Sequence, residues 1–197
     1  MIKAVIFDLN GVFIQSPLLS DRFSEKFNVS EKKFLPVLKE IMVKVRKPNA
    51  GDAFDLWKPH LNEWKVYLSR EQFFDFWFSA EKEVSEMIAL AKKLKAGKLR
   101  LFILSNNFAE RAAYYKKKFR FLGELFEKVS YSWETGFVKP DRSAFENILS
   151  SRPESRRMHL RGQSGKQHCY SKICGHEDNI FYRCQRTGKE FEKISLI

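Results

Sequence analysis

The chain of 197 residues lacks several features that would place it in common protein classes. No apolar run reaches the roughly 18 residues that a membrane-spanning helix needs. No basic region followed by a free apolar segment precedes Asp8, so we find no secretory signal. These absences predict a globular protein of the cytoplasm, with a chain long enough for one well-buried core and a modest insertion.

Cysteine is scarce, and all three copies lie in residues 151–197 with three of the four His residues. The same segment contains no Ala and no Val, which are among the commonest residues of folded domains. A zinc site there would have suitable ligand types but lacks two paired C-x₂₋₄-C spacings. A disulfide framework does not suit a cytoplasmic chain. The zinc alternative therefore stays open for His168, Cys169, Cys174, His176 and Cys184.

Acidic residues are outnumbered, and the net charge is +12. The Lys residues are scattered through the sequence, which is typical of a solvated surface. The densest basic patches are Lys116–Lys118 and the Arg-rich stretch after Arg152, and neither lies in a recognisable nucleic-acid-binding module. A solvated surface is therefore our main interpretation of this charge, nucleic-acid binding stays a minor hypothesis, and we expect no membrane partner.

Residues 1–150 alternate strand-like and helix-like segments. Residues 3–9 (KAVIFDL) and 99–105 (LRLFILS) are short apolar runs that predict buried parallel strands. Helical spacing follows over 84–97 and 106–119, and residues 125–132 and 139–149 predict a further strand and helix. The pattern predicts an α/β fold with a doubly wound, mainly parallel sheet.

Residues 15–91 contain no strand-like run and predict an all-helical insertion. Apolar residues between 34 and 45 follow helical spacing, and Ser69 with Gln72 has the form of a capping box. We therefore expect an α/β core over 1–14 and 92–150, a helical unit over 15–91, and an atypical tail over 151–197.

Polar side chains stand where the predicted strands end. Asp8 follows the first strand, Ser105 and Asn106 end the next, and Lys139 lies in a later loop. The carboxyl ends of parallel strands share one edge of a sheet, where ligands bind. A carboxylate, a hydroxyl and an ammonium group together suit phosphoryl transfer, with Mg²⁺ to offset repulsion between anions.

These motifs resemble those of the haloacid dehalogenase (HAD) superfamily. The stretch FDLNGV resembles its first motif, with Asp8 as the nucleophile, LFILSNN its second with Ser105, and Lys139 with Pro140 its third. The helical insertion is similar to the small C1-type cap of the family, in the branch of sugar phosphatases and epoxide-hydrolase phosphatases. Cap residues set substrate choice, so the motifs leave the substrate and the oligomeric state open.

The resemblance implies a role for each matching residue. Asp8 would form an aspartyl-phosphate, Ser105 and Asn106 would bind the phosphoryl oxygens, and Lys139 would neutralise charge. Asp8 and the backbone carbonyl of Asn10 would bind Mg²⁺. The substrate would be a small phosphorylated metabolite. A catalytically impaired binding protein is the alternative, and a haloacid-dehalogenase-type hydrolase is a further variant.

Asn10 departs from the family pattern. Most phosphatases of the family carry at this position an acid that protonates the leaving group, and an amide cannot replace it. General acid catalysis contributes about 10²–10⁴-fold in rate. We therefore expect a preference for substrates with good leaving groups.

The fourth motif of the family, a strand ending in acids, is missing from its usual window. Glu177 and Asp178 come too late in the sequence to replace it. Read one nucleotide further along, permitted codons from residue 152 onward can encode a family-like ending that includes CIFVD. Our hypothesis is that a frameshift replaced the natural sequence from about Ser151. We then expect a poorly ordered tail and no strand beside the first one.

Overall fold

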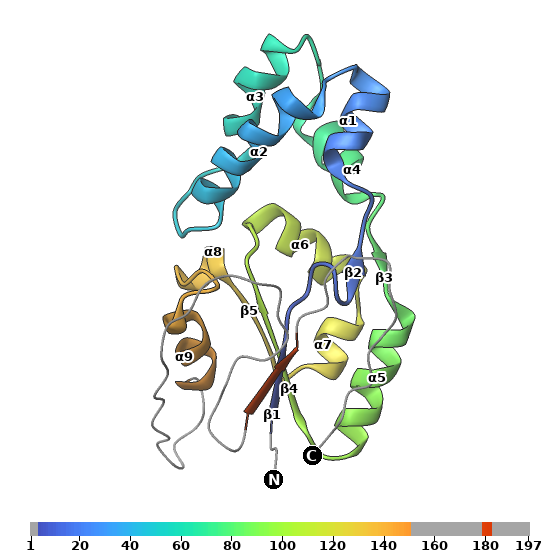
Figure 1. Ribbon diagram of the computed structural model, residues 1–197, viewed down its shortest axis with the longest axis vertical. Helices are drawn as coiled ribbons and strands as arrows, with labels where there is room; N and C mark the ends of the chain where they lie inside the picture. The colour runs from blue at the N-terminus through green and yellow to red at the C-terminus, as the bar shows by residue number, and fades with distance from the viewer. Residues whose placement is uncertain (1–3, 151–178, 183–197) are drawn as a thin grey trace.

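The computed structural model describes residues 4–150 and 179–182 and shows an α/β fold (Figure 1). A parallel sheet carries helices on both faces, so the predicted fold class is confirmed. In chain order the elements are β1 (Ala4–Phe7), β2 (Ile14–Gln15), α1 (Leu19–Phe27), α2 (Glu31–Val45), α3 (Ala53–Glu63), α4 (Arg70–Phe78), β3 (Lys82–Glu83), α5 (Ser85–Ala96), β4 (Arg100–Ser105), α6 (Ala109–Lys118), α7 (Phe121–Leu125), β5 (Lys128–Tyr131), α8 (Ser132–Thr135), α9 (Arg142–Ser150) and β6 (Asn179–Tyr182).

The main sheet has the strand order β5-β4-β1-β6, and every neighbouring pair is parallel. β1 pairs with β4 from Ala4↔Arg100 to Phe7↔Ile103, so both strands end at the same edge. The expectation that no strand lies beside the first one is wrong, because β6 pairs with β1 from Ala4↔Asn179 to Phe7↔Tyr182. The first strand is therefore flanked on both sides.

Both faces of the sheet are buried, which explains the continuous apolar runs of its strands. Val5 and Phe7 face a cluster that includes residues of α5, α6 and α7, whereas Ala4 and Ile6 face α9. Burying a Val or Phe side chain stabilises a fold by about 1.5–3 kcal/mol. These runs therefore fix the strands and, with them, the positions of the polar residues that follow.

Helices α1–α4 form a separate four-helix unit between the two short strands β2 and β3. These strands pair antiparallel through Ile14↔Glu83 and Gln15↔Lys82 and connect the unit to the sheet (Figure 1). The unit has its own hydrophobic core, rich in Phe and Trp. The predicted capping box of Ser69 and Gln72 is confirmed at the start of α4. The expected insertion of residues 15–91 covers this unit and the first half of α5, which packs on the sheet.

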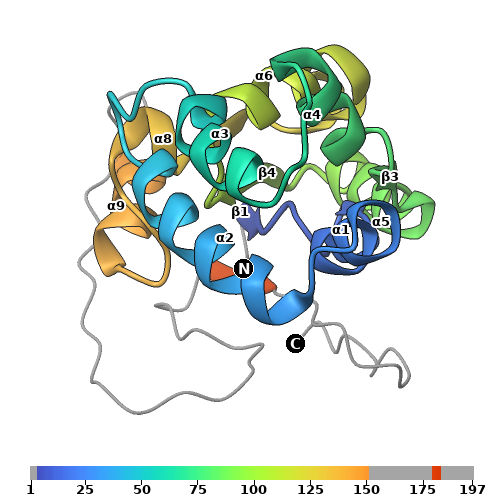
Figure 2. The same ribbon diagram turned by 90° about the horizontal axis from the view of Figure 1, so that it is seen from above.

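The four-helix unit contacts the core at several places. Phe108, which precedes α6, is buried in the aromatic core of the unit. The backbone N–H of Ala53 donates a 2.7 Å hydrogen bond to Glu110 of α6. A Cβ placed on Gly136 would lie 3.5 Å from Pro48 in the α2–α3 loop. Viewed from above, the helices of the unit surround the position of β1 and β4 (Figure 2).

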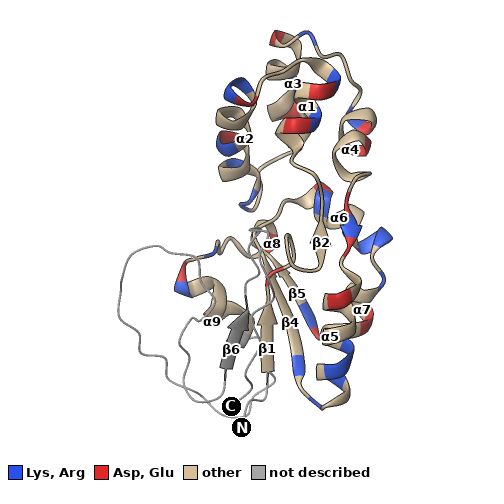
Figure 3. Ribbon diagram, turned by 45° about the vertical axis from the view of Figure 1, so that its right-hand side comes forward, with Lys and Arg blue, Asp and Glu red and all other residues tan. Residues whose placement is uncertain are grey.

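Charged residues of both signs are distributed over the two parts of the molecule. Lys and Arg occur on α2 as well as on α5 and α6, with Asp and Glu among them (Figure 3). None of the described helices combines the length and the apolarity that crossing a bilayer requires.

Candidate active site

Asp8 directly follows β1, at the edge of the sheet that faces the four-helix unit. Its Oδ1 accepts a 2.7 Å hydrogen bond from the Leu9 N–H and lies 2.8 Å from Lys139 Nζ. The Asp8 and Lys139 side chains are 23% and 17% exposed, so the pair is screened from bulk water but still accessible. The Lys139 ammonium group therefore lies where it can offset negative charge on the Asp8 carboxylate.

A tight turn after Asp8 determines where Asn10 lies. Gly11 has a φ of +83°, a left-handed conformation that costs glycine little and other residues more. Its N–H donates a 2.8 Å hydrogen bond to the Ile14 carbonyl, and the Phe13 N–H donates a 2.9 Å bond to the Leu9 carbonyl. The turn brings Asn10 beside the end of β4, where the Ser105 hydroxyl donates to Asn10 Oδ1 over 3.3 Å.

Asn106 holds the loop that carries Lys139. Its Nδ2 donates a 2.8 Å hydrogen bond to the Lys139 carbonyl, and its Oδ1 accepts a 2.8 Å bond from the Lys139 N–H. The structure thus brings together all five predicted residues, in the linked pairs Asp8–Lys139, Asn106–Lys139 and Ser105–Asn10. Their roles in binding and catalysis stay predictions.

Three further polar residues lie behind Asn10 and escape detection in the sequence. Asn10 Nδ2 donates a 2.6 Å hydrogen bond to the buried Tyr115 hydroxyl, and the Arg111 guanidinium lies 5.4 Å from the Tyr115 ring centroid. Arg111 Nη2 is 2.5 Å from Glu81 Oε1, and the Glu81 side chain is fully buried. Burial, followed by the Glu81 charge, raises the pKa of Tyr115 well above its usual range, so its phenol stays protonated. The helical spacing of apolar residues in α6 is consistent with a buried Tyr115, but it does not indicate the hydrogen bond between Tyr115 and Asn10.

Arg46, at the C-terminal end of α2, adds a cation to the same region. Burial lowers the pKa of Arg46, as does the positive charge of Arg111, whereas the Asp8 carboxylate opposes both effects. Arg46 Nε is buried and makes no hydrogen bond within the described residues. The loop that follows it reaches Pro48, which lies against Gly136 on the way to Lys139. The four-helix unit thus contributes a partly desolvated guanidinium within electrostatic range of Asp8.

The oxygen donors near Asp8 match the ligand preference of Mg²⁺. This ion takes one or two carboxylates and completes its shell with waters and substrate phosphate. The Asp8 carboxylate and the Asn10 carbonyl are donors of that kind. Residues 4–150 and 179–182 contain no cluster of three or more His, Cys, Asp or Glu that could hold a metal. The tail candidates Glu177 and Asp178, and the Cys and His residues of the zinc alternative, lie outside the described residues.

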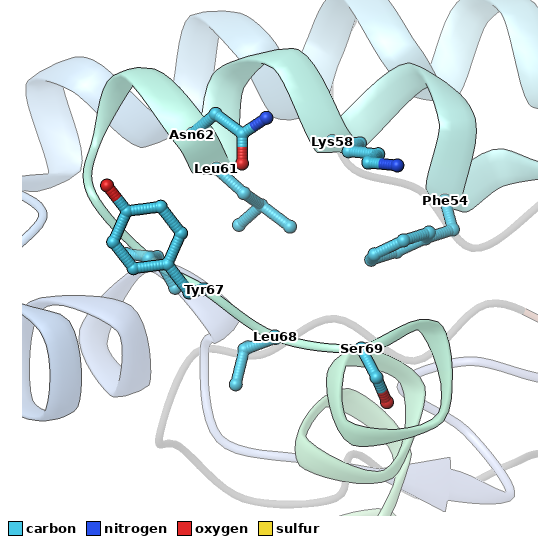
Figure 4. Close-up of a pocket in the computed structure, with 8 residues that line it drawn as sticks. Phe54, Lys58, Leu61, Asn62, Tyr67, Leu68 and Ser69 are labelled. Atoms are coloured by element: carbon cyan, nitrogen blue, oxygen red, sulfur yellow. The ribbon is translucent and has the colours of Figure 1, made fainter.

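A pocket of about 300 Å³ lies within the four-helix unit, between α3 and the segment that leads to α4 (Figure 4). None of the predicted site residues lines it. Its lining is Phe54, Lys58, Leu61, Asn62, Val66, Tyr67, Leu68 and Ser69.

Comparison with known proteins identifies the architecture. Neither a protein-family model nor a curated protein sequence matches the chain. Among solved structures, a HAD family enzyme from Bacteroides thetaiotaomicron superposes with a TM-score of 0.64 at 23% identity, over 76% of this chain and 77% of that one. The chain has a haloacid dehalogenase-like fold.

Two other solved structures share the haloacid dehalogenase-like fold. A predicted HAD-like family hydrolase from Porphyromonas gingivalis superposes with a TM-score of 0.57 at 23% identity, over 76% of each chain. The L-2-haloacid dehalogenase from Xanthobacter autotrophicus superposes with a TM-score of 0.55 at 14% identity, over 77% of this chain and 65% of that one. The predicted fold resemblance is confirmed, and the cap type and branch stay predictions.

Proposed function

We propose that this chain is a Mg²⁺-dependent phosphatase that acts on a small phosphate monoester. The observation that carries the proposal is the half-buried pair of Asp8 and Lys139 at the carboxyl end of two central strands. A carboxylate in this place attacks phosphorus, while the ammonium group and the Ser105 hydroxyl offset charge on the phosphoryl oxygens. Asn106 supports the reaction by fixing the loop of Lys139.

The reaction would proceed in two displacements. Both described contacts of the Asp8 carboxylate involve Oδ1, so we assign the attack to Oδ2. A bond forms between Oδ2 and phosphorus, the ester P–O bond breaks, and the leaving alcohol takes a proton from water. Water then attacks phosphorus and the Oδ2–P bond breaks, while the proton that this water loses neutralises the hydroxide left by the first step, so inorganic phosphate is released and Asp8 is regenerated. Asn10 supplies no proton in either step, so substrates with good leaving groups react fastest.

Asp8 and the Asn10 carbonyl would hold Mg²⁺, which when bound offsets the repulsion between the carboxylate and the phosphate. The HAD family enzyme from Bacteroides thetaiotaomicron has been crystallised in complex with magnesium and inorganic phosphate. This complex supports the assignment by analogy of fold.

We propose further that the four-helix unit is the cap that closes over Asp8 and that the substrate is a small phosphorylated metabolite. Arg46 supports this role because the unit places its guanidinium within electrostatic range of the Asp8 carboxylate. Such a cation would contact the phosphate ester only when the unit is seated on the core.

Turnover of a generic aryl phosphate tests the proposal. We expect hydrolysis that requires Mg²⁺, stops with chelator and falls to background in Asp8→Asn. Asp55→Asn, which changes an exposed carboxylate in the first turn of α3, is the matched control and should leave the rate unchanged. Equal activity of the Asp8→Asn variant and the wild type would overturn the proposal.

A second candidate is a binding protein that holds a phosphorylated ligand without turnover. The Asn10 amide favours it, because both of its polar atoms are engaged with Ser105 and Tyr115. Calorimetric binding of inorganic phosphate without hydrolysis of any aryl phosphate would support this candidate. Halide release from a 2-haloacid would instead indicate the dehalogenase variant.

For residues 151–197 we propose the frameshift as the origin of the sequence. The support is the loss of Ala and Val after Ser150 together with the concentration of Cys and His there. The pairing of β6 with β1 runs against this origin, so composition alone carries the proposal. Sequencing the coding DNA from codon 140 to the stop tests it, and a missing or additional base near codon 151 is expected. An intact frame would overturn it, and zinc titration would then test the tail.

A further inference from the structure

The turn after the candidate nucleophile contains the one Asn–Gly step of the sequence, Asn10–Gly11. In such a step the backbone nitrogen of glycine can attack the side-chain amide carbon of asparagine, because glycine has no Cβ to hinder the approach. The product is a cyclic succinimide, which water opens to aspartate or isoaspartate. Asn10 is therefore the residue at which the sequence most favours deamidation.

Deamidation needs water as its one co-reactant. The Gly11 nitrogen loses its proton to hydroxide and forms a bond to Asn10 Cγ. The Cγ–Nδ2 bond then breaks, and ammonia leaves with a proton from water. A second water adds to one of the two ring carbonyl carbons and opens the ring. In sum, asparagine and water give ammonia and either aspartate or isoaspartate.

In the folded chain both reacting groups are engaged in hydrogen bonds. The Gly11 N–H donates to the Ile14 carbonyl over 2.8 Å, so this bond must break before the nitrogen can lose its proton. Asn10 Nδ2 donates to the buried Tyr115 hydroxyl over 2.6 Å, and Asn10 Oδ1 accepts from the Ser105 hydroxyl over 3.3 Å. An amide that is held at both polar atoms cannot rotate toward the Gly11 nitrogen.

Buried side chains on both sides of Gly11 anchor the turn. Leu9, Phe13 and Ile14 are at most 2% exposed, whereas Gly11 is exposed. The Leu9 carbonyl also accepts a 2.9 Å hydrogen bond from the Phe13 N–H. Opening the turn would therefore break backbone hydrogen bonds and bring apolar surface into water, so the open state is rarely populated.

We propose that Asn10 is a deamidation site that the fold keeps unreactive and that the Tyr115 hydroxyl is the main group that holds its amide. Deamidation then proceeds from states in which the turn is open. The product carries a carboxylate two residues after the candidate nucleophile, where the chain has an amide. The effect of this change on turnover rests on the proposed function, whereas the modification itself does not.

Peptide mapping of the wild-type protein tests the site. Trypsin releases residues 4–22 as one peptide, in which mass spectrometry detects the conversion of the amide and an isoaspartyl methyltransferase detects isoaspartate. We expect residue 10 to convert about tenfold more slowly, or slower still, in the native protein than in guanidinium chloride. Equal rates in the two states would overturn the protection, and absent conversion in the unfolded protein would overturn the site.

Tyr115→Phe tests the hold on the amide. Loss of one hydrogen bond should raise the rate of conversion in the native protein about fivefold. Tyr114→Phe is the matched control, because the Tyr114 hydroxyl bonds only to exposed Lys118 among the described contacts. Ile148→Val controls for lost stability, because Ile148 is buried on the other face of the sheet and the truncation costs about as much as one hydrogen bond.

The role of Tyr115 is overturned if Tyr115→Phe and Ile148→Val convert at the same rate. Ser105→Ala gives the same comparison if Tyr115→Phe does not fold. This variant releases Asn10 Oδ1 from its 3.3 Å hydrogen bond and should also raise the rate above that of Ile148→Val. An unchanged rate in Ser105→Ala would overturn the hold on the amide.

If the phosphatase proposal holds, conversion of Asn10 should change turnover. Aspartate at position 10 can protonate a leaving group, and general acid catalysis contributes about 10²–10⁴-fold in rate. Turnover of an alkyl phosphate should therefore rise on prolonged storage in proportion to the aspartate found in peptide 4–22. Constant turnover while aspartate accumulates would overturn this consequence. Failure of the proposed function would instead appear as absent turnover of aryl and alkyl phosphates with the conversion rates as expected.

Discussion

The strand-end crevice and the four-helix unit are built by different kinds of contact. In the crevice, Asp8, Asn10 and Asn106 each make hydrogen bonds or ion pairs of defined geometry with one or two named partners. In the four-helix unit, rings such as Phe34, Trp57 and Phe73 pack on several other rings each. Hydrogen bonds and ion pairs depend on distance and angle, so they hold the groups that they join in defined positions. Ring packing depends mainly on how completely the rings fill the core.

Because of this difference, the four-helix unit should contribute mainly to stability and the crevice mainly to catalysis. An aromatic cluster loses a large amount of buried area when one of its rings is removed. A polar crevice buries little apolar area, but one lost contact misplaces a reacting group. We therefore expect substitutions in the four-helix unit to change mainly stability and substitutions in the crevice to change mainly turnover. The following predictions test this division.

Trp57→Ala should give the largest effect on stability. Trp57 is fully buried in the four-helix unit and stacks on Phe34 with ring centroids 5.3 Å apart. Truncating a buried Trp costs about 3–5 kcal/mol in free energy of unfolding. Urea unfolding measures the loss. Tyr67→Ala in the same unit is the control, because Tyr67 is 78% exposed and its loss should cost under about 0.5 kcal/mol.

Lys139→Met should give the largest effect on turnover after Asp8→Asn. The variant removes the cation 2.8 Å from Asp8 while keeping a chain of similar length. Loss of one electrostatic stabiliser of the transition state lowers kcat by about 10²–10³-fold. Steady-state kinetics with an aryl phosphate checks this value. Lys117→Met, on the exposed face of α6, should leave kcat unchanged, and equal losses in the two variants would contradict the division.

The sequence predicted β1, β4 and β5, but not β6, and the residues at the ends of β1 and β4, because these depend on local patterns. The runs AVIF and RLFILS are apolar throughout, and a parallel strand buried on both faces needs that composition. Once these strands are assigned, Asp8, Ser105 and Asn106 follow at their ends. Lys139 is placed by its loop, which the sequence assigned to the same edge.

The sequence did not predict the contacts that cross between distant elements. Glu81 and Arg111 are separated by α5 and β4 in the chain, and no local pattern distinguishes their ion pair from an exposed one. The sequence indicates only that Arg46 lies at the end of a helix, not that it is within electrostatic range of Asp8. The short strands β2 and β3 are also missing from the sequence prediction, since two residues carry no periodicity. All of these features depend on contacts between elements that are far apart in the chain.

Arg46→Met would show whether the four-helix unit contributes to binding as well as to stability. Removing a charged hydrogen-bond donor from a partly buried site costs about 1.5–3 kcal/mol, so KM should rise roughly tenfold or more with a smaller change in kcat. Lys44→Met is the control, because Lys44 is exposed and pairs with Glu40 on the same helix. An unchanged KM in the Arg46 variant would confine substrate contacts to the core.

Glu110→Gln should give the smallest effect, a change in the pH dependence of stability at the contact between the two regions. Burial, despite the hydrogen bond from Ala53, raises the pKa of Glu110 above its ordinary value of 4.5. A raised folded-state pKa adds stability below the ordinary value, and this stability is lost as pH rises through the folded-state value. Wild-type stability relative to Glu110→Gln should therefore be highest at low pH and decline toward neutrality.

Asp52 contributes in the opposite sense in both proteins. Although burial opposes it, the hydrogen bonds from the Phe54 N–H and from Arg70 lower the pKa of Asp52, so its stabilisation is lost as pH falls. Asp52 and Glu110 influence the pKa of each other, so the difference in Tm between the wild type and the variant reports on the two carboxylates together. Glu86→Gln, in the exposed first turn of α5, controls for the charge at a helix start. An equal pH slope for Glu86→Gln would mean that the contact with Ala53 contributes nothing to the pH dependence of stability, and the ring packing around Phe108 would then be a stronger candidate for what joins the two regions.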